Sequence, residues 1–176
     1  MLLFELMNPN INVHSLIYKD NPPELYHLSK DANLKKLSPR IPKDVTNTEN
    51  PFEENTIPRI SFAESINGCI LGLQLKESQF EKGICRFYVY QPIISEHTHL
   101  VSNDTINNNR LVFDSMITKE WWGLNTAHVK KIGIIEVQEK PFKTIEFTPL
   151  RIGDKKFLKP NGKLDTYQYD FKWVKQ

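Results

Sequence analysis

The segment Thr166–Trp173, TYQYDFKW, alternates polar with aromatic side chains at every position. A period of two is what a β-strand with one buried face produces. The segment therefore predicts a strand whose aromatic face packs on the core. Two further runs, Ile84–Gln91 (ICRFYVYQ) and Val129–Val137 (VKKIGIIEV), are rich in β-branched and aromatic residues and predict two more strands.

Shorter strands are predicted along the rest of the chain. They lie at Leu2–Leu6 (LLFEL), Leu25–Leu28, Arg59–Phe62, Arg110–Phe113, Thr144–Phe147 and Lys156–Leu158. The turn sequence Pro160-Asn161-Gly162 predicts that the last of these pairs with the final strand. The chain is thus expected to end in a basic, aromatic hairpin.

One helix is expected, from Glu64 to about Lys76, because apolar residues recur along one face of this segment. Gly68 and Gly72 lie four apart within it and each costs a helix about 1 kcal/mol relative to alanine. We therefore expect the helix to pack closely against a sheet. The predicted fold class is α+β, with a strongly curved, mostly antiparallel sheet or split barrel and one or two helices, in a single domain over residues 1–176.

The segment 38–58 interrupts this pattern with four prolines, Pro39, Pro42, Pro51 and Pro58, among polar side chains. Proline cannot donate a hydrogen bond to a sheet ladder, so this segment is excluded from the sheet interior. Loops of this length inside a compact domain are usually functional. We expect it to cross the surface near the functional cleft.

The composition is that of one folded domain. A hydrophobic fraction of 39% with 10 Phe, 6 Tyr and 3 Trp can fill a core, and 25% charged residues is an ordinary share. Cys69 and Cys85 lie in apolar segments and are expected to be buried free thiols, which favours a reducing compartment. The start resembles no signal peptide, and no apolar run approaches the ~20 residues of a membrane helix. A cytoplasmic protein without membrane contact is expected.

Charge is distributed unevenly along the chain. The formal net charge is +2, yet residues 151–176 hold seven basic and three acidic side chains. A basic segment of this kind can contact the phosphates of a nucleic acid. The four aromatic residues of the final strand share one face, which is expected to be core, so stacking on bases is not expected there.

Three short segments carry a resemblance. They are Leu25-Tyr26-His27-Leu28-Ser29, Pro58-Arg59-Ile60-Ser61-Phe62-Ala63-Glu64-Ser65 and Asp114-Ser115-Met116-Ile117-Thr118-Lys119-Glu120-Trp121-Trp122. Their order resembles the first strand, the hydroxyl-bearing strand with its helix, and the glutamate-bearing late strand of the ADP-ribosyltransferase superfamily. The resemblance covers roughly residues 24–137 and implies that NAD is the substrate.

The resemblance also implies roles for particular residues. Glu120 is the implied catalytic carboxylate, since cleavage between ribose and nicotinamide builds positive charge on the sugar. His27 is implied to donate to ribose hydroxyls, with Tyr26 or Phe62 stacking on the nicotinamide ring. Ser29, Arg59 and Ser61 complete the implied nucleotide-binding set.

Two departures narrow the implied activity. Thr118 stands two residues before Glu120, where arginine-modifying members carry Glu or Gln, which argues against an arginine acceptor. The chain also lacks the spaced arginines of the tRNA 2′-phosphotransferases of the same fold, because its arginines are only Arg40, Arg59, Arg86, Arg110 and Arg151.

Each residue also has a structural interpretation. His27 can be a satisfied core or edge histidine, Glu120 a solvated residue, and Trp121 and Trp122 core residues. The run Glu96-His97-Thr98-His99 lacks a third ligand at a recognisable spacing, so no metal site is predicted.

Two function hypotheses remain open. The first is an NAD-dependent ADP-ribosyltransferase-like protein that acts on an unknown acceptor or binds a related nucleotide. The second is a non-catalytic interaction module that binds a protein or nucleic acid through its C-terminal lysines. These are Lys155, Lys156, Lys159, Lys163, Lys172 and Lys175.

Overall fold

The computed structural model describes residues 12–42, 56–73, 75–109, 111–112, 114–139, 147–152, 155–160 and 169–175. These ranges contain strands β1 to β10, helices α1 to α3 and two short 3-10 helices. Every strand pairing among them is antiparallel. The expected α+β class with mostly antiparallel sheets and few helices is confirmed, and the described strands do not close into a barrel.

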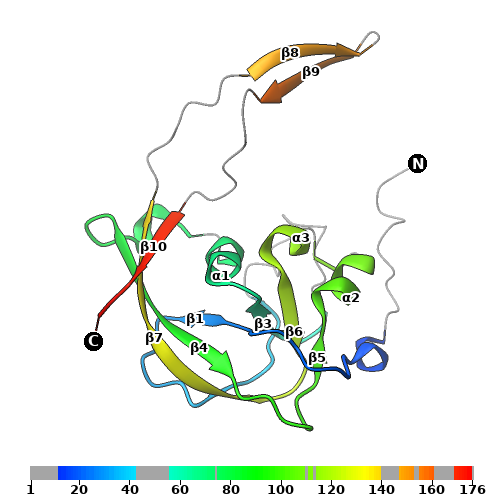
Figure 1. The fold of residues 1–176 in the computed structure, drawn as a ribbon, viewed down its shortest axis with the longest axis vertical. Coiled ribbons are helices and arrows are strands. Elements are labelled where there is room, and N and C mark those ends of the chain that lie inside the picture. The colour runs from blue at the N-terminus through cyan, green and yellow to red at the C-terminus, as the bar shows by residue number, and fades with distance from the viewer. Residues whose placement is uncertain are drawn as a thin grey trace.

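The largest sheet has the order β1-β4-β7-β10. Its strands are β1 (His27–Ser29), β4 (Ile84–Pro92), β7 (Ala127–Glu139) and β10 (Tyr169–Trp173). Figure 1 shows that the long strands β4 and β7 bend together, and their register shifts between Val89 and Tyr90. A fifth strand, β2 (Lys36–Leu37), pairs with the start of β7.

A smaller sheet carries the elements of the predicted site. It has the order β3-β6-β5, with β3 at Ile60–Ala63, β6 at Glu120–Gly123 and β5 at Leu100–Val101. The two sheets meet where Tyr26, just before β1, forms an isolated bridge with Ala63 at the end of β3. The segments that contain His27, Ser61 and Glu120 are therefore neighbours in space.

The C-terminal pairing differs from the prediction. β9 (Lys155–Pro160) pairs with β8 (Phe147–Ile152), and β10 pairs with β7 instead of with residues 156–158. Residues 161–168, which include the predicted Pro-Asn-Gly turn and Thr166–Gln168, lie outside the described residues. The ring of Trp173 lies against Gly133, where a Cβ would be 2.5 Å from it, so β10 packs on the bare backbone of β7.

Three short helices complete the fold: α1 (Ile66–Gly72), α2 (Asn103–Asn108) and α3 (Ser115–Thr118). α1 begins after Ser65, whose hydroxyl accepts the Gly68 N–H at 3.0 Å and caps the helix. Its buried residues Ile66 and Ile70 pack on one face of the large sheet with Phe87 and Ile135. In Figure 1 α1 accordingly covers this sheet.

The other two core clusters lie on opposite faces of the small sheet. One joins Phe62 and Trp121 to Leu25, Ile60, Leu100 and Ala127. The second joins Trp122 to the apolar residues around α2, namely Val13, Val101, Ile106, Leu111 and Val112. Trp121 and Trp122 are 4% and 0% exposed, so the core interpretation of both tryptophans is confirmed.

Several predicted elements have other outcomes. Leu111 and Val112 are buried but form no strand, so their apolar character reflects core burial in an irregular segment. The predicted strand at Leu2–Leu6 and residues 144–146 lie outside the described residues, as do residues 43–55 of the proline-rich segment. Within the described ranges no helix is long and apolar enough to cross a membrane.

The two glycines of α1 have different surroundings. A Cβ on Gly68 would lie 2.1 Å from the Thr118 carbonyl oxygen, whereas the nearest atom to a Cβ on Gly72 is a side-chain methyl of Thr118 at 4.0 Å. The predicted close packing is thus present at Gly68 and absent at Gly72. At Gly68 it involves β3 as well as α3, because a Cβ there would also lie 3.1 Å from the Ala63 Cβ.

Gly68→Ala should destabilise the fold by at least about 2 kcal/mol, because the backbone carbonyl of Thr118 cannot yield without displacing α3. Gly72→Ala is the matched control, and it should be neutral or stabilising by up to about 1 kcal/mol because alanine favours a helix. Urea unfolding of the two variants measures this difference. Equal stability of both would show that α1 and α3 are not in close contact.

Candidate functional site

A cleft of about 690 Å³ lies where β1, the segment after β2, β3 and α1 meet the start of β6. The described start of the proline-rich segment lines it with Ser38, Pro39 and Pro42, as expected, whereas the described residues 56–58 at the other end of the segment do not. The polar and charged residues in its lining include His27, Ser29, Lys36, Arg40, Arg59, Ser61, Asp114 and Glu120. The structure thus brings together the three residues on which the sequence argument depended, His27, Ser61 and Glu120.

Glu120 is held in a defined orientation by neutral donors. The Ser61 hydroxyl donates to Glu120 Oε1 at 2.7 Å, and the Trp122 indole N–H donates to the same oxygen at 3.0 Å. The geometry follows from the β3–β6 register, which pairs Ser61 with Trp122 and Ala63 with Glu120, so these side chains share one face. These two hydrogen bonds fix the direction of the carboxylate.

The backbone before Glu120 is anchored as well. Lys119 has a left-handed conformation (φ 53°) that ends α3 and turns the chain into β6. The buried side chain of Asn103 donates to the carbonyl oxygens of Ser115 at 2.7 Å and Glu120 at 3.1 Å. α2 therefore supports the turn that delivers the carboxylate.

His27 contacts the same network from β1. Its Nδ1 lies 3.0 Å from the Ser61 carbonyl oxygen, and because a carbonyl can only accept, Nδ1 must carry the hydrogen. Burial lowers the pKa of His27, the Arg40 charge lowers it further, and the Ser61 carbonyl opposes both. The ring is therefore neutral near pH 7, and Nε2 is a hydrogen-bond acceptor, which is the reverse of the donating role first expected.

Two arginines lie together at the start of β3. Arg40 and Arg59 form an isolated antiparallel bridge, with both backbone N–H groups donating across it. The Arg59 guanidinium is buried 4.4 Å from the Trp122 ring centroid, while Arg40 is exposed. The Trp122 indole also donates to Glu120, so Arg59 and Glu120 contact the same side chain.

Two further predicted binding residues, Ser29 and Phe62, line the cleft, but Phe62 is almost fully buried. Ser29 lines the cleft, and its hydroxyl accepts the Asp31 N–H at 3.1 Å. Phe62 is only 2% exposed and meets the His27 ring edge-on with 6.1 Å between centroids. It therefore supports the histidine and offers little surface to a ligand.

Tyr26 is not among the residues that line the cleft. Its ring packs against the cluster beneath α1, and its hydroxyl donates to Glu24 at 2.6 Å. That hydrogen bond is the main reason that the pKa of Tyr26 is raised. From this position the Tyr26 ring does not face the cleft, where the nicotinamide ring was expected to stack on it.

Sequence reasoning did not assign Lys36, Arg40 or Asp114 to the predicted site. Lys36 and Arg40 follow β1 in a segment without periodicity, so no local signal indicated where they would lie. Asp114 is partly buried, and this burial raises the pKa of its carboxyl group. Thr118, two residues before Glu120, is buried and donates to the Asp114 carbonyl at 3.2 Å.

Cys69 of α1 lines the cleft beside these groups. Its thiol donates to the Tyr26 carbonyl at 3.2 Å, and burial raises its pKa to about 12. A cysteine nucleophile needs a thiolate, which such a pKa suppresses. Cys69 is therefore a structural residue of the cleft wall.

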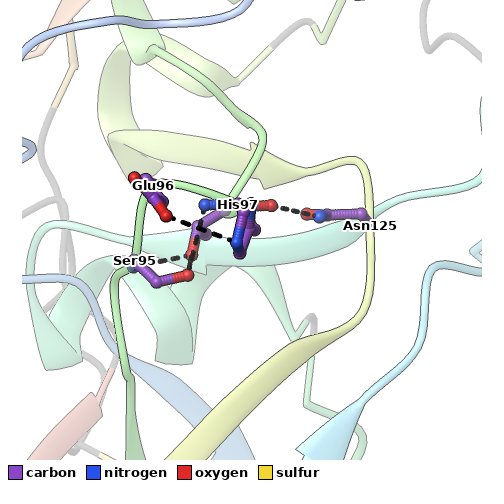
Figure 2. Close-up of polar contacts among 5 residues, drawn as sticks. Ser95, Glu96, His97 and Asn125 are labelled. Atoms are coloured by element: carbon purple, nitrogen blue, oxygen red, sulfur yellow. Dashed lines mark hydrogen bonds and ion pairs between the residues drawn. The ribbon is translucent and has the colours of Figure 1, made fainter.

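The histidine-containing turn lies elsewhere, between β4 and β5. Figure 2 shows His97 Nε2 facing Glu96, at 3.5 Å with both side chains highly exposed, and Asn125 donating to the His97 carbonyl at 2.5 Å. Asn125 also accepts the His99 N–H at 2.9 Å. The turn is thus held by Asn125, and no group of three metal-binding side chains occurs in the described ranges.

Comparison with known proteins gives no relative from which a function could be transferred. No protein-family model, no curated protein and no solved structure matches the chain. The function has to be argued from the cleft itself.

Iodoacetamide at pH 8 should leave Cys69 unmodified in the folded protein, because a pKa of about 12 leaves roughly one thiol in ten thousand ionised. Cys85, which is fully buried, is the internal control and should also stay unmodified. Both should react in urea, and peptide mapping by mass spectrometry distinguishes them. Rapid modification of Cys69 before unfolding would contradict the assignment of an inert thiol.

Proposed function

We propose that the protein is an NAD-dependent ADP-ribosyltransferase of the family that its sequence resembles, with Glu120 as the catalytic carboxylate. The observation that carries the proposal is the connected arrangement of His27, Ser61 and Glu120 around one cleft. Three residues from widely separated parts of the chain converge there, and each has the chemical type that cleavage of NAD requires.

Glu120 has the environment expected of a carboxylate that stabilises a sugar cation. When the bond between ribose C1′ and the nicotinamide nitrogen breaks, its electron pair leaves with nicotinamide and positive charge develops on the sugar. A fixed negative charge next to C1′ lowers the energy of that transition state without reorganising. Ser61 and Trp122 fix the direction of the Glu120 carboxylate through two hydrogen bonds from neutral donors.

The other polar residues of the cleft fit the rest of the substrate. A neutral His27 can accept a hydrogen bond from a ribose hydroxyl through Nε2, which positions the sugar for reaction. Arg40 and Lys36 are exposed cations in the lining and can contact the two phosphates. A cleft of this volume is in the usual range for a cofactor-sized ligand.

The arrangement of the elements also supports the proposal. The resembled family takes its histidine from an early strand, its hydroxyl residue from a second short strand before a helix, and its glutamate from a late strand. In this chain His27 lies in β1, Ser61 lies in β3, which α1 follows, and Glu120 lies in β6. β3 pairs with β6 and is bridged to the residue before β1.

The alternative of a non-catalytic interaction module has less support in the described residues. Of its C-terminal lysines, Lys172 lies 3.2 Å from Glu136, an ion pair that offsets its charge. Lys163 lies outside the described residues, and the side chains of Lys155, Lys156 and Lys159 are not described. We also propose a cytoplasmic location, because both cysteines are free thiols, as is usual in a reducing compartment.

Glu120→Gln should reduce release of nicotinamide from NAD by at least ~100-fold, the scale for removing one electrostatic contact to a transition state. The amide keeps the size of the side chain, so the unfolding midpoint should change little. Glu81→Gln is the matched control, since Glu81 is exposed and does not line the cleft. Chromatography of released nicotinamide measures the rate.

Two results would contradict this assignment. A wild-type protein that releases no nicotinamide would indicate a binding shell without chemistry. Undiminished turnover in Glu120→Gln would move the catalytic role to another carboxylate. Asp114 lines the cleft and would be tested first, and Glu64, which accepts the Trp121 indole N–H at 2.8 Å, would follow.

NAD affinity should be constant near neutral pH and weaken as the pH falls below the lowered pKa of His27, because protonation removes the Nε2 acceptor. The fold also loses stability in this range, since an unfolded histidine with pKa near 6.5 takes up the proton first. Titration calorimetry should therefore be restricted to pH values at which circular dichroism shows a folded protein.

His27→Gln retains a side-chain acceptor that does not titrate, so it should bind NAD with a flatter pH profile. His27→Ala should bind weakly at every pH. An affinity that rises on acidification in the wild type, and not in His27→Gln, would instead place His27 against a phosphate.

A further inference from the structure

A second groove adjoins the cleft. It has a volume of about 380 Å³ and is formed by the turn 32–35, Ile93 and residues 129–131 at the start of β7. Leu34 lines both the groove and the cleft. The two hollows therefore share one wall, and a chain-like ligand could cross Leu34 from one to the other.

The shared wall is held in place by Tyr90. The hydroxyl of this fully buried tyrosine donates to the Asp31 carbonyl at 2.7 Å and accepts the Leu34 N–H at 3.3 Å. The Val129 N–H donates to the Lys35 carbonyl at 3.0 Å, which ties the turn to β7. The groove is thus preformed by backbone hydrogen bonds.

The groove and the cleft edge next to it concentrate positive charge. Residues 27–42 and 127–131 contain six of the chain's 23 basic side chains and one of its 21 acidic ones, and all six basic residues except Lys30 line the groove or the cleft. The rest of the chain is therefore net negative, although the whole has a charge of +2. The single acidic residue is Asp31, whose carboxylate accepts the Asn33 N–H at 2.8 Å within the turn.

The lysines of the groove divide into fixed and exposed ones. Lys131 donates to the Ala32 carbonyl at 3.0 Å and lies 5.3 Å from the Tyr88 ring centroid, which fixes its charge at the groove wall. Lys35 and Lys130 are exposed, and within the described ranges neither has a carboxylate partner. These two are placed to meet a phosphate.

We propose that this groove binds a single-stranded nucleic acid, and that a nucleotide of this strand enters the cleft as the acceptor of the proposed transfer. The cations continue across the shared wall, because Lys36 and Arg40 line the cleft on its other side. A repeating phosphate backbone matches a path of cations, and the exposed Ile93 offers apolar contact to a base. A base that is to reach side chains in a cleft must be out of a duplex stack, which favours a single strand.

The part of the proposal that makes a nucleotide the acceptor rests on the proposed function. The transfer of ADP-ribose to it proceeds as follows. A nucleophilic oxygen or nitrogen of the nucleotide forms a bond to ribose C1′ as the bond to nicotinamide breaks. The departing electron pair neutralises the pyridinium nitrogen, and the proton of the acceptor passes to the Glu120 carboxylate. No oxidant or metal is required.

The test is fluorescence anisotropy with labelled 12-nucleotide oligo-dT and oligo-U, over a range of salt concentrations and without NAD. The double variant Lys35→Ala/Lys130→Ala should bind at least ~10-fold more weakly at low salt. The slope of log affinity against log salt should decrease in magnitude by about 1.4, or about 0.7 for each lost phosphate contact with a single strand. The two oligonucleotides distinguish DNA from RNA.

The control is Lys19→Ala/Lys76→Ala, which removes the same charge from exposed residues that line neither hollow. Equal loss in both double variants, absence of oligonucleotide binding at 50 mM salt, or tighter binding of duplex or poly-glutamate than of single strands would each overturn the proposal. Oligonucleotide binding without NAD cleavage would contradict only the proposed function. NAD cleavage without oligonucleotide binding would contradict only the groove.

Discussion

The register between β3 and β6 determines the geometry of the candidate site. Successive residues of a strand face opposite sides, so a shift of one residue would move Ser61 and Glu120 to different faces. Phe62 and Trp121, which are directly paired and nearly fully buried, oppose such a shift because it would expose both rings. The burial of Phe62 and Trp121 on one face of the small sheet therefore specifies where Ser61 and Glu120 lie on the other face.

Local pattern was sufficient to predict the long strands and insufficient to predict their partners. β4 and β7 were predicted within two residues at each end, because their runs of β-branched and aromatic residues are long. The pairing of β10 with β7 depends on Gly133, which leaves room for the Trp173 ring, and on contacts distant in sequence.

α2 was missed because its sequence NDTINN consists of poor helix formers. It forms because Ser102 caps it and Ile106 is buried.

The order of the motifs indicated where His27, Ser61 and Glu120 would meet, but not which of their neighbours could join them. Tyr26 and His27 are consecutive at β1, so their side chains point to opposite sides, and of the two only His27 lines the cleft. Phe62, which follows Ser61 in β3, lines the cleft but is only 2% exposed. The alternation rule alone would have removed Tyr26 from the predicted site, whereas the burial of Phe62 depends on its packing with Trp121. Arg40 and Lys36 could not be found in this way, since a segment without periodicity gives no indication of its path.

Several contacts restrain the position of Glu120 and of the backbone that carries it. Ser61 and Trp122 donate neutral hydrogen bonds to the carboxylate, and Asn103 holds the backbone that carries it. The backbone of Gly68 in α1 also packs closely against Thr118, two residues before Glu120. A displacement of about 1 Å can reduce a rate by ~100-fold. A carboxylate that stabilises a transition state must therefore be held rigidly in position. A glycine in a seven-residue helix, unfavourable for the helix itself, is consistent with that requirement because only its missing side chain permits the contact.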